Sequence, residues 1–222
     1  SSQVSQMAVG DLDDDGVDEV CLTTYNGDVI CLNALNGELK WHRRLDWYIN
    51  NPRIMIQRVT PGPGKNLCFT VGRDVEFNTS GHARPRINFV RNPSLLVLDA
   101  EGNDALLIPD YAAHNGDGHN TWLYDVDDDG CCEIVASGDN RVVIFDHAGK
   151  RLCDLPCKPE GDSPNAHPDA VLVCDWAPER LGNEIVYLDG TDGIVCADSR
   201  GDVLSSQTYT PDVASHLQEI HA

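Results

Sequence analysis

Two short acidic segments hold the side chains of this sequence best suited to binding a metal ion. In segment 11–19, carboxylates stand at the first, third, fifth and ninth positions, a glycine at the sixth and a main-chain carbonyl at the seventh. Segment 125–133 repeats this arrangement. Calcium takes hard oxygen ligands at such spacings from one contiguous loop that turns at a glycine. We therefore predict two calcium sites, one formed by Asp11, Asp13, Asp15, Glu19 and the Val17 carbonyl, the other by Asp125, Asp127, Asp129, Glu133 and the Cys131 carbonyl.

Two alternatives to calcium are open for these segments. Magnesium also prefers oxygen ligands, but it needs a tighter octahedron and keeps more of its water. Alternatively, both segments are solvated acidic turns between strands. A third, degraded copy begins at Asp175 and ends at Glu184, but the insertion 177–180 lengthens it and removes the ligand at the third position. We do not expect a metal there.

Histidines and arginines form a second group, suited to an acidic sugar. His119 and His167 each stand a few residues before an acidic segment, and the segment 72–93 is rich in arginine. Elimination at a uronate needs a cation at the carboxylate, a base for the C5 proton and an acid at the leaving oxygen. We predict His119 or His167 as the base and Arg84 or Arg86 as the neutralising cation. The predicted substrate-binding set is Arg73, Arg84, Arg86, Arg91, His114, Asp117, Asp169 and His216.

The alternatives for this second group are structural. A histidine at the start of a strand can cap backbone groups, and surface arginines often pair with acidic neighbours. The charge distribution favours the ligand hypothesis, because residues 40–91 hold ten basic and three acidic side chains in a chain of net charge −20. A positive region on an acidic protein can attract a polyanion.

The elements that position these residues are repeated β-strands. After each acidic segment comes an apolar run and then a small polar turn ending in glycine, as at Gly37, Gly149 and Gly201. A fourth such turn ends at Gly102, and upstream of it Arg58 stands where the acidic start is expected. The Asn26-Gly27 pair predicts a two-residue hairpin. Repeats of about 40 to 50 residues with four strands each are typical of propeller blades.

We therefore predict an all-β chain, a β-propeller of four-stranded blades, within one domain. The expected blades are residues 1–48, 49–113, 114–165 and 166–212, with the start of a further blade at 213–222. Their inner strands are expected near residues 6–10, 53–58, 120–124, 170–174 and 216–221. Five inner strands with four outer sets favour a four-blade section of a larger propeller, or half of an assembly. The alternative is a compact four-blade ring with an additional strand.

Composition limits the remaining function classes. The chain has 222 residues with 36 acidic and 16 basic side chains, which argues against a nucleic-acid-binding protein. Its apolar runs are strand-sized, and we expect neither a membrane span nor a signal peptide. The calcium segments favour an extracellular or periplasmic location. The nine cysteines are expected to be reduced and buried, with one or two disulfides as the alternative.

The acidic segment followed by a strand and a glycine turn resembles the FG-GAP (VCBS) calcium-loop propellers. Residues 167–184, with His167, Asp169, Asp175, Pro178 and Glu184, are similar to a segment of the rhamnogalacturonan lyases of polysaccharide lyase family 11. This resemblance implies a large calcium-bearing propeller that cleaves an acidic pectin backbone by β-elimination. The chain is too short for the whole family domain, and its second blade lacks the acidic segment.

Two functional hypotheses follow. In the first, the protein acts on or binds an acidic polysaccharide or oligosaccharide, as a lyase or as the part of one that contributes its cleft. In the second, it is a non-catalytic module that binds carbohydrate or protein. In either case, further blades from the same parent protein or a partner chain would complete the assembly.

Overall fold

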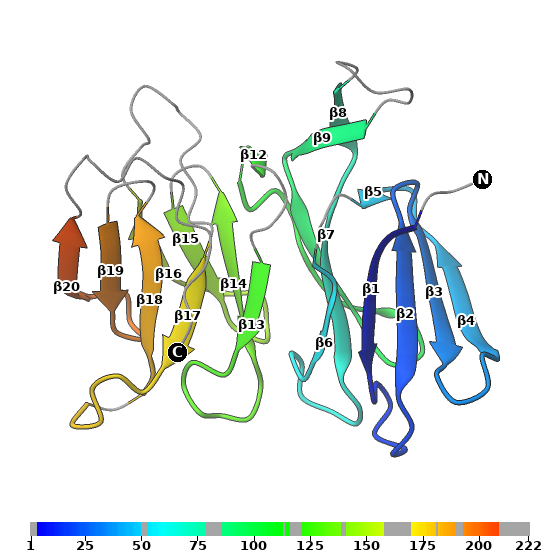
Figure 1. Ribbon diagram of the computed structural model, residues 1–222, viewed down its shortest axis with the longest axis horizontal. Helices are drawn as coiled ribbons and strands as arrows, with labels where there is room; N and C mark the ends of the chain where they lie inside the picture. Colours follow the sequence, from blue (N-terminus) through cyan, green and yellow to red (C-terminus); the bar gives the residue numbers. More distant parts are fainter. Residues whose placement is uncertain are drawn as a thin grey trace. The chain divides into compact units, whose positions relative to one another are not determined.

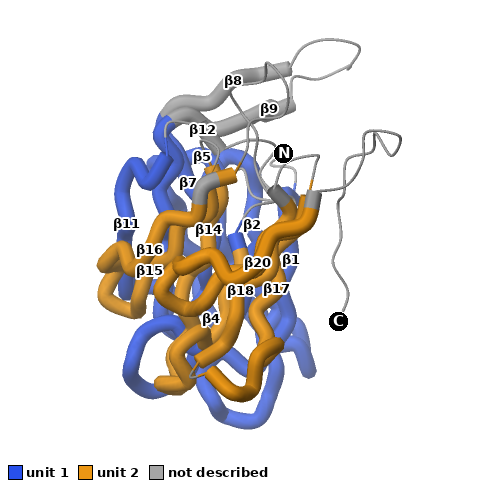
Figure 2. Tube along the Cα trace, turned by 90° about the vertical axis from the view of Figure 1, so that its left-hand side faces the viewer, with its two compact units in different colours: residues 1–121 blue, residues 122–222 orange. Residues whose placement is uncertain are grey.

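Every regular element that the structure describes is a β-strand. The computed structural model describes residues 4–49, 53–78, 86–112, 114–115, 121–138, 141–157, 170–180, 182–189 and 193–208. The strands belong to two compact units, Ser1–Thr121 and Trp122–Ala222, and each unit is described here by itself (Figures 1 and 2). Among the described residues, no helix has the length and apolar character needed to span a bilayer.

The first sheet of unit 1 is a four-stranded antiparallel meander. Its strands pair in chain order, and they are β1 (Val4–Gly10), β2 (Glu19–Thr24), β3 (Asp28–Asn33) and β4 (Leu39–Arg44). Strands β2 and β3 form the predicted hairpin, but its loop has three residues, Tyr25 to Gly27, where the Asn26-Gly27 pair predicted two. Gly27 has φ 90°, and a Cβ there would lie 2.3 Å from the Trp47 carbonyl oxygen, so only glycine fits this turn.

The second sheet of unit 1 has a divided first strand. Its order is β11-β10-β7-β5, and β6 pairs with the same strand β7. Here β5 pairs with Gly72 and Val71, whereas β6 pairs with residues from Asn66 to Cys68. The single inner strand predicted at 53–58 is therefore β6 alone, with β5 added farther along β7. The bounds are β5 (Tyr48–Ile49), β6 (Met55–Gln57), β7 (Asn66–Gly72), β10 (Ser94–Leu98) and β11 (Asp104–Ile108).

The long insertion of the second repeat forms a small sheet of its own. Strands β8 (Asp74–Asn78) and β9 (Arg86–Arg91) make a hairpin, and β12 (His114–Asn115) pairs with β9. His114 lies directly opposite Arg91 in this pairing. The sequence did not reveal these strands, because the alternation within 74–91 is too irregular to separate two short strands from a connection.

Unit 2 consists of two further four-stranded sheets with the same connectivity. The third sheet contains β13 (Thr121–Tyr124), β14 (Glu133–Gly138), β15 (Arg141–Phe145) and β16 (Arg151–Pro156). The fourth contains β17 (Val171–Cys174), β18 (Glu184–Asp189), β19 (Gly193–Ala197) and β20 (Val203–Thr208). The predicted inner strands at 6–10, 120–124 and 170–174 correspond to β1, β13 and β17, and the one at 216–221 lies outside the described residues.

The apolar core of each unit lies between its two larger sheets. In unit 1, Cys21, Val29 and Cys31 of the first sheet pack with Leu67 and Phe69 of the second. In unit 2, Val135 and Ile144 of the third sheet pack with Ile185 and Tyr187 of the fourth. All nine cysteines are free, and most of them are buried, as expected from their apolar surroundings.

Candidate metal centres

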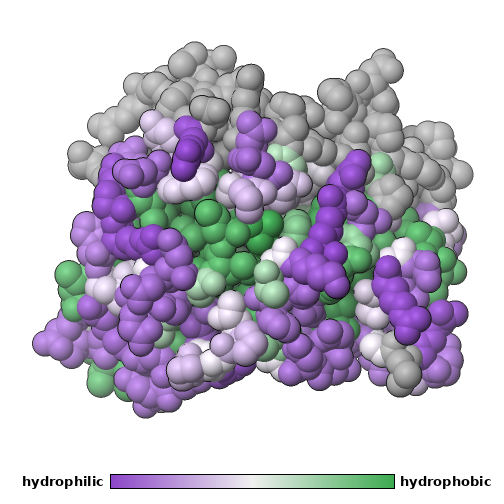
Figure 3. All heavy atoms as spheres, turned by 180° about the vertical axis from the view of Figure 1, so that it is seen from behind, coloured by the Kyte–Doolittle hydropathy of each residue, from purple (hydrophilic) through white to green (hydrophobic). Residues whose placement is uncertain are grey.

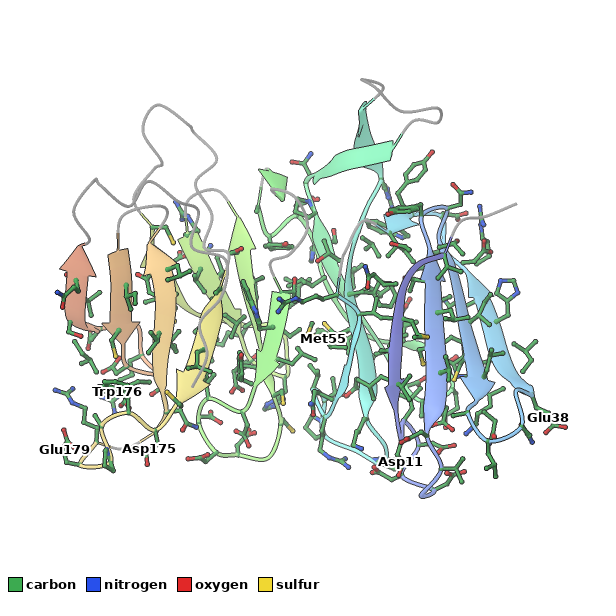
Figure 4. All side chains as sticks on the ribbon, in the orientation of Figure 1. Asp11, Glu38, Met55, Asp175, Trp176 and Glu179 are labelled. Atoms are coloured by element: carbon green, nitrogen blue, oxygen red, sulfur yellow. The ribbon has the colours of Figure 1, made fainter. Side chains whose placement is uncertain are left out.

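The acidic loop 11–19 is folded around its own first aspartate. The Asp15 and Gly16 amides donate to the two oxygens of Asp11 at 3.1 Å each, and the Val17 amide donates to Asp15 Oδ1 at 2.7 Å. Gly16 has φ 87°, which allows the reversal. As a result, one carboxylate oxygen each of Asp11, Asp13 and Asp15 lie within 4.8 Å of one another. Figure 4 labels Asp11 at the loop end of sheet β1–β4, the end where purple, hydrophilic side chains also gather in Figure 3.

The loop 125–133 repeats this geometry in unit 2. The Asp129 and Gly130 amides donate to the oxygens of Asp125 at 3.1 and 3.0 Å, and the Cys131 amide donates to Asp129 Oδ1 at 2.7 Å. The oxygens that converge within 4.8 Å here belong to Asp125, Asp127 and Glu133. Among the described residues these two acidic groups are the ones that could hold a metal, and loop 175–184 does not form a third.

The ninth position has a role that the sequence did not reveal. Glu19 and Glu133 are at most 1% exposed, and each accepts a hydrogen bond from the amide seven residues earlier, Leu12 at 2.8 Å and Val126 at 2.7 Å. Glu184 accepts from Ala177 in the same way, although its loop has lost the ligand pattern. In the second blade Asn66 accepts from Val59 at 2.9 Å. The buried side chain at this position therefore closes the loop in every blade.

This closing contact was detectable in principle. A glutamate or asparagine opens the second strand of each repeat, seven residues after an apolar or small residue. In two of the four copies this glutamate also fits the metal-binding pattern. It was therefore predicted as a ligand, and its role in closing the loop was missed. The predicted ligands Glu19 and Glu133 consequently bind backbone with one oxygen and have one oxygen left for a cation.

Positively charged side chains surround the loop 11–19. Lys40 Nζ lies 2.6 Å from Asp13 Oδ2 and 2.8 Å from Glu19 Oε1. This pairing raises the pKa of Lys40 and lowers that of Asp13. From the second blade, Arg58 pairs with Asp14 at 2.6 Å, and Lys65 Nζ donates to the Asp11 carbonyl at 3.0 Å. Loop 58–66 thus supplies cations where its own sequence lacks the acidic ligands.

Loop 125–133 has neutral neighbours at the corresponding positions. Leu152 stands in β16 where Lys40 stands in β4, as the pairings with β15 and β3 show. Asn183 replaces Lys65 and donates from Nδ2 to the Asp125 carbonyl at 3.0 Å. Among the described residues, the basic side chain that pairs with this loop is His147, 3.7 Å from Asp129. Burial, with Asp127 and Asp129 adding repulsion, raises the pKa of Glu133 to about 7.

Both loops could hold a metal ion, and a different observation supports this in each. In loop 11–19, Asp13 Oδ1 is buried and has no hydrogen-bond partner. In loop 125–133, no lysine or arginine of the described residues pairs with the converging carboxylates, and burial raises the pKa of Glu133. In each site the converging side-chain atoms are hard carboxylate oxygens, which suit calcium. The two loops connect β1 to β2 and β13 to β14, so a bound ion would tie each pair of strands together.

The predicted ligand-binding residues are described only in part. Arg73 is exposed, and its guanidinium carbon lies 4.7 Å from the centroid of the Trp47 ring, a cation–π contact. Arg86, Arg91 and His114 lie in strands β9 and β12, but their side chains are outside the described part. The remaining predicted residues, His119, His167, Arg84, Asp117, Asp169 and His216, lie outside the described residues altogether and stay predictions.

Arg73 and Trp47 line a cavity of about 330 Å³ in unit 1, which the sequence did not predict. Two of its lining residues have left-handed backbone conformations, Asn92 with φ 47° and Asp110 with φ 45°. The Asp110 amide donates to Ser94 Oγ at 3.2 Å, which fixes one wall. Non-glycine residues with positive φ are uncommon and often occur at functional sites. The described residues that line it are Trp47, Arg73, Asn92, Ser94, Leu107, Pro109 and Asp110.

Comparisons with known proteins identify the fold. No protein-family profile matches the chain, and no curated protein matches it. BBS1N, solved in complex with ARL6DN and soaked with lead, is similar with a TM-score of 0.56 and 12% identity. The match covers 95% of this chain and 56% of BBS1N, so the chain spans about half the length of that protein. BamB from Moraxella catarrhalis matches with a TM-score of 0.31 and 16% identity, over 94% of this chain and 77% of BamB. The likeness to BBS1N and the repeated four-stranded sheets show that the chain has a β-propeller fold.

Proposed function

We propose that the protein is a non-catalytic binding module of propeller fold whose loops 11–19 and 125–133 each hold calcium. The observation that carries this proposal is the repetition of one hydrogen-bond pattern in both loops, each time bringing three carboxylate oxygens within 4.8 Å. The three clustered carboxylates of each loop repel one another without a cation. The bound ions act as staples between strands, since each loop joins two paired strands.

Calcium titration followed by thermal unfolding tests this proposal. We expect calcium to raise the melting temperature and a chelator to lower it, with magnesium acting more weakly because it demands a tighter octahedron. Asp127→Asn should remove most of the calcium effect of loop 125–133. Asp202→Asn, an exposed change in unit 2 outside both loops, is the matched control. If the melting temperature does not respond to calcium or to chelator, the loops are solvated turns.

The ligand of the module is a separate part of the proposal. The residues of the cavity beside Trp47 favour an acidic carbohydrate as this ligand. A guanidinium can neutralise a uronate carboxylate, an indole ring can stack on the apolar face of a sugar, and Asn92 and Asp110 can bind hydroxyl groups. Oligogalacturonate should quench tryptophan fluorescence and bind in a salt-sensitive way, whereas a neutral galactan should not. Arg73→Met should abolish this binding, and Arg141→Met, on the exposed surface of unit 2, should not affect it. Equal binding of the neutral galactan would exclude carboxylate recognition.

A protein ligand is the second candidate. BBS1N was solved in complex with ARL6DN, so one protein of similar fold binds a protein partner. At 12% identity this supports the class of function and no particular partner.

Lyase activity stays a prediction from the family resemblance, and no comparison supports it. The candidate bases His119 and His167 and the cation Arg84 lie outside the described residues. Release of an unsaturated uronate from acidic pectin fragments, followed by its ultraviolet absorbance, would show cleavage. Binding of oligogalacturonate without that product would agree with the non-catalytic module.

A further inference from the structure

One face of the first sheet is apolar and open to solvent. On it, Met7 lies opposite Leu22 and Leu22 opposite Ile30, while Val9 lies opposite Val20 and Val20 opposite Leu32. Met7 and Val9 are 59% and 54% exposed, and the other four side chains are half-buried. Apolar rows of this kind across three strands are unusual on a solvated sheet face. We call these six residues the open face.

The equivalent face is fully buried in the second and fourth sheets. The four central residues of the open face lie in β2 and β3. Residues at the same register positions lie in β7 and β10 of the second sheet and in β18 and β19 of the fourth sheet. In those sheets the side chains are between 0% and 6% exposed, because a neighbouring sheet of the same unit packs on them. They are Leu67, Phe69, Leu96 and Leu98 in one case and Ile185, Tyr187, Val195 and Ala197 in the other. The open face therefore has the composition of a surface between blades.

The fourth sheet carries the matching half of such a contact. Within unit 1, the side chains that cover the second sheet come from the first sheet and include Ala8, Cys21 and Val29. The residues at the same register positions in the fourth sheet are Leu172, Val186 and Ile194, which are half-buried. One chain thus holds both halves of a contact between blades.

The loop ends that would meet in such a contact carry charges of both signs. Lys65 and Asn183 each stand directly before the loop-closing residue, and each contacts the acidic loop of the preceding blade. In the first sheet this position is Asp18, which is exposed. The loop 175–184 at the end of the fourth sheet carries the exposed Arg180, and Figure 4 shows Trp176 and Glu179 on the same loop. The same loop carries the exposed Asp175 and Glu179, so Asp18 would meet charges of both signs there, and the match between the two halves rests on their apolar side chains.

We propose that the open face is an interface between two copies of this chain, on which sheet β17–β20 of a second copy docks as neighbouring blades dock within each unit. The driving force is burial of the exposed apolar rows. Because two different surfaces meet, the contact is heterologous. In a dimer, one copy therefore still exposes its open face and the other its fourth sheet, until further copies close a ring. This association is independent of calcium binding and of the cavity beside Trp47.

Sedimentation velocity over a wide range of protein concentration tests the interface. Val9→Lys on the open face and Val186→Lys on the fourth sheet should each raise the dissociation constant by roughly tenfold or more. Met7→Gln is a milder variant at an exposed position, with a smaller effect in the same direction. Leu35→Lys makes a similar change in the same blade at a side chain 84% exposed outside the open face, and it should leave association unchanged.

Mixing the two lysine variants gives the sharpest result. The Val186→Lys copy keeps an intact open face and the Val9→Lys copy keeps an intact fourth sheet, so the mixture should form a one-to-one dimer that neither variant forms alone. Folding of each variant is checked by circular dichroism. The proposal is overturned if the wild-type chain is monomeric at every concentration, if Val9→Lys associates normally, or if mixing restores nothing.

Discussion

Loops 11–19 and 125–133 have the same backbone and different electrostatics. In both, the first aspartate accepts two amide hydrogen bonds, and the ninth residue accepts the amide of the second. The first loop is contacted by Lys40, Arg58 and Lys65, whereas the second is contacted by Asn183 and, at longer range, by His147. The backbone conformation therefore does not depend on which group neutralises the carboxylates.

This difference shows that the acidic residues have two separate roles, closing the loop and binding a cation. Loop closure needs a buried acceptor at the ninth position, and even Asn66 provides it in a loop without acidic ligands. Neutralisation needs a cation, which the protein itself supplies in part to the first loop. We therefore expect loop 125–133 to depend on calcium more strongly than loop 11–19.

The largest expected effect comes from truncating the two closing glutamates. Glu19→Ala leaves the Leu12 amide without its acceptor and Lys40 without one of its two carboxylates, which should cost about 3 kcal/mol. Glu133→Ala, measured without calcium, also removes a repelled carboxylate and should cost only about 1 kcal/mol. Urea unfolding of both variants measures the difference. Equal losses would mean that Lys40 adds nothing to the closure of the first loop.

A pH dependence should distinguish the loops next. The pKa of Glu133 is raised to about 7 from the ordinary 4.5, so between these values the folded state holds a proton that the unfolded state releases. Stability without calcium should therefore fall as the pH rises from about 4.5 to 7, by an amount on the order of 2 kcal/mol. Glu133→Gln keeps an acceptor for the Val126 amide and cannot ionise, so it should flatten this part of the profile.

Saturating calcium should flatten the same profile, because the ion stabilises the ionised glutamate. A profile that Glu133→Gln leaves unchanged would assign the pH dependence to another group.

Exchanging the cation between the two loops is expected to have a smaller effect. Lys40→Leu removes the ammonium from Asp13 and Glu19, and should lower stability without calcium by about 1.5 kcal/mol while increasing the stabilisation that calcium gives. Leu152→Lys places an ammonium at the corresponding position of β16 and should reduce the calcium effect on unit 2. The calcium-dependent change in melting temperature is the measurement. Changes of the same sign in both variants would show that the two positions are not equivalent.

The sequence predicted the blades because each repeat carries its own local signals. The Asn26-Gly27 turn, the glycine turns and the acidic loops recur at blade spacing, and each depends on neighbouring residues only. The ligand trios were predictable for the same reason, since Asp11, Asp13 and Asp15 lie on one short loop. The hairpin β8–β9 was not, because its strands are short and irregular in pattern.

Contacts between residues far apart in the chain could not be predicted from the sequence. Lys40 reaches Asp13 from 27 residues away, and Asn183 reaches Asp125 from 58 residues away. No local spacing signals such pairs, and they decide which acidic loop is neutralised by the protein. The cavity beside Trp47 is formed in the same way, from strands that are distant in the chain.

The smallest expected effect comes from a contact between neighbouring blades. It is made by the residue directly before the loop-closing residue. Lys65 and Asn183 bind equivalent carbonyls, of Asp11 and Asp125, at 3.0 Å each, but one donor is charged and the other neutral. Lys65→Ala and Asn183→Ala should each cost about 1 kcal/mol, since each loses one hydrogen bond to a carbonyl. Only the cost of Lys65→Ala should decline as salt is added, because its ammonium also lies 4.0 Å from Asp14 and acts on the charge of the whole loop. Urea unfolding at low and high salt measures both costs. If both decline together, the two contacts are electrostatically alike, and the contrast between the loops rests on Lys40 and Arg58 alone.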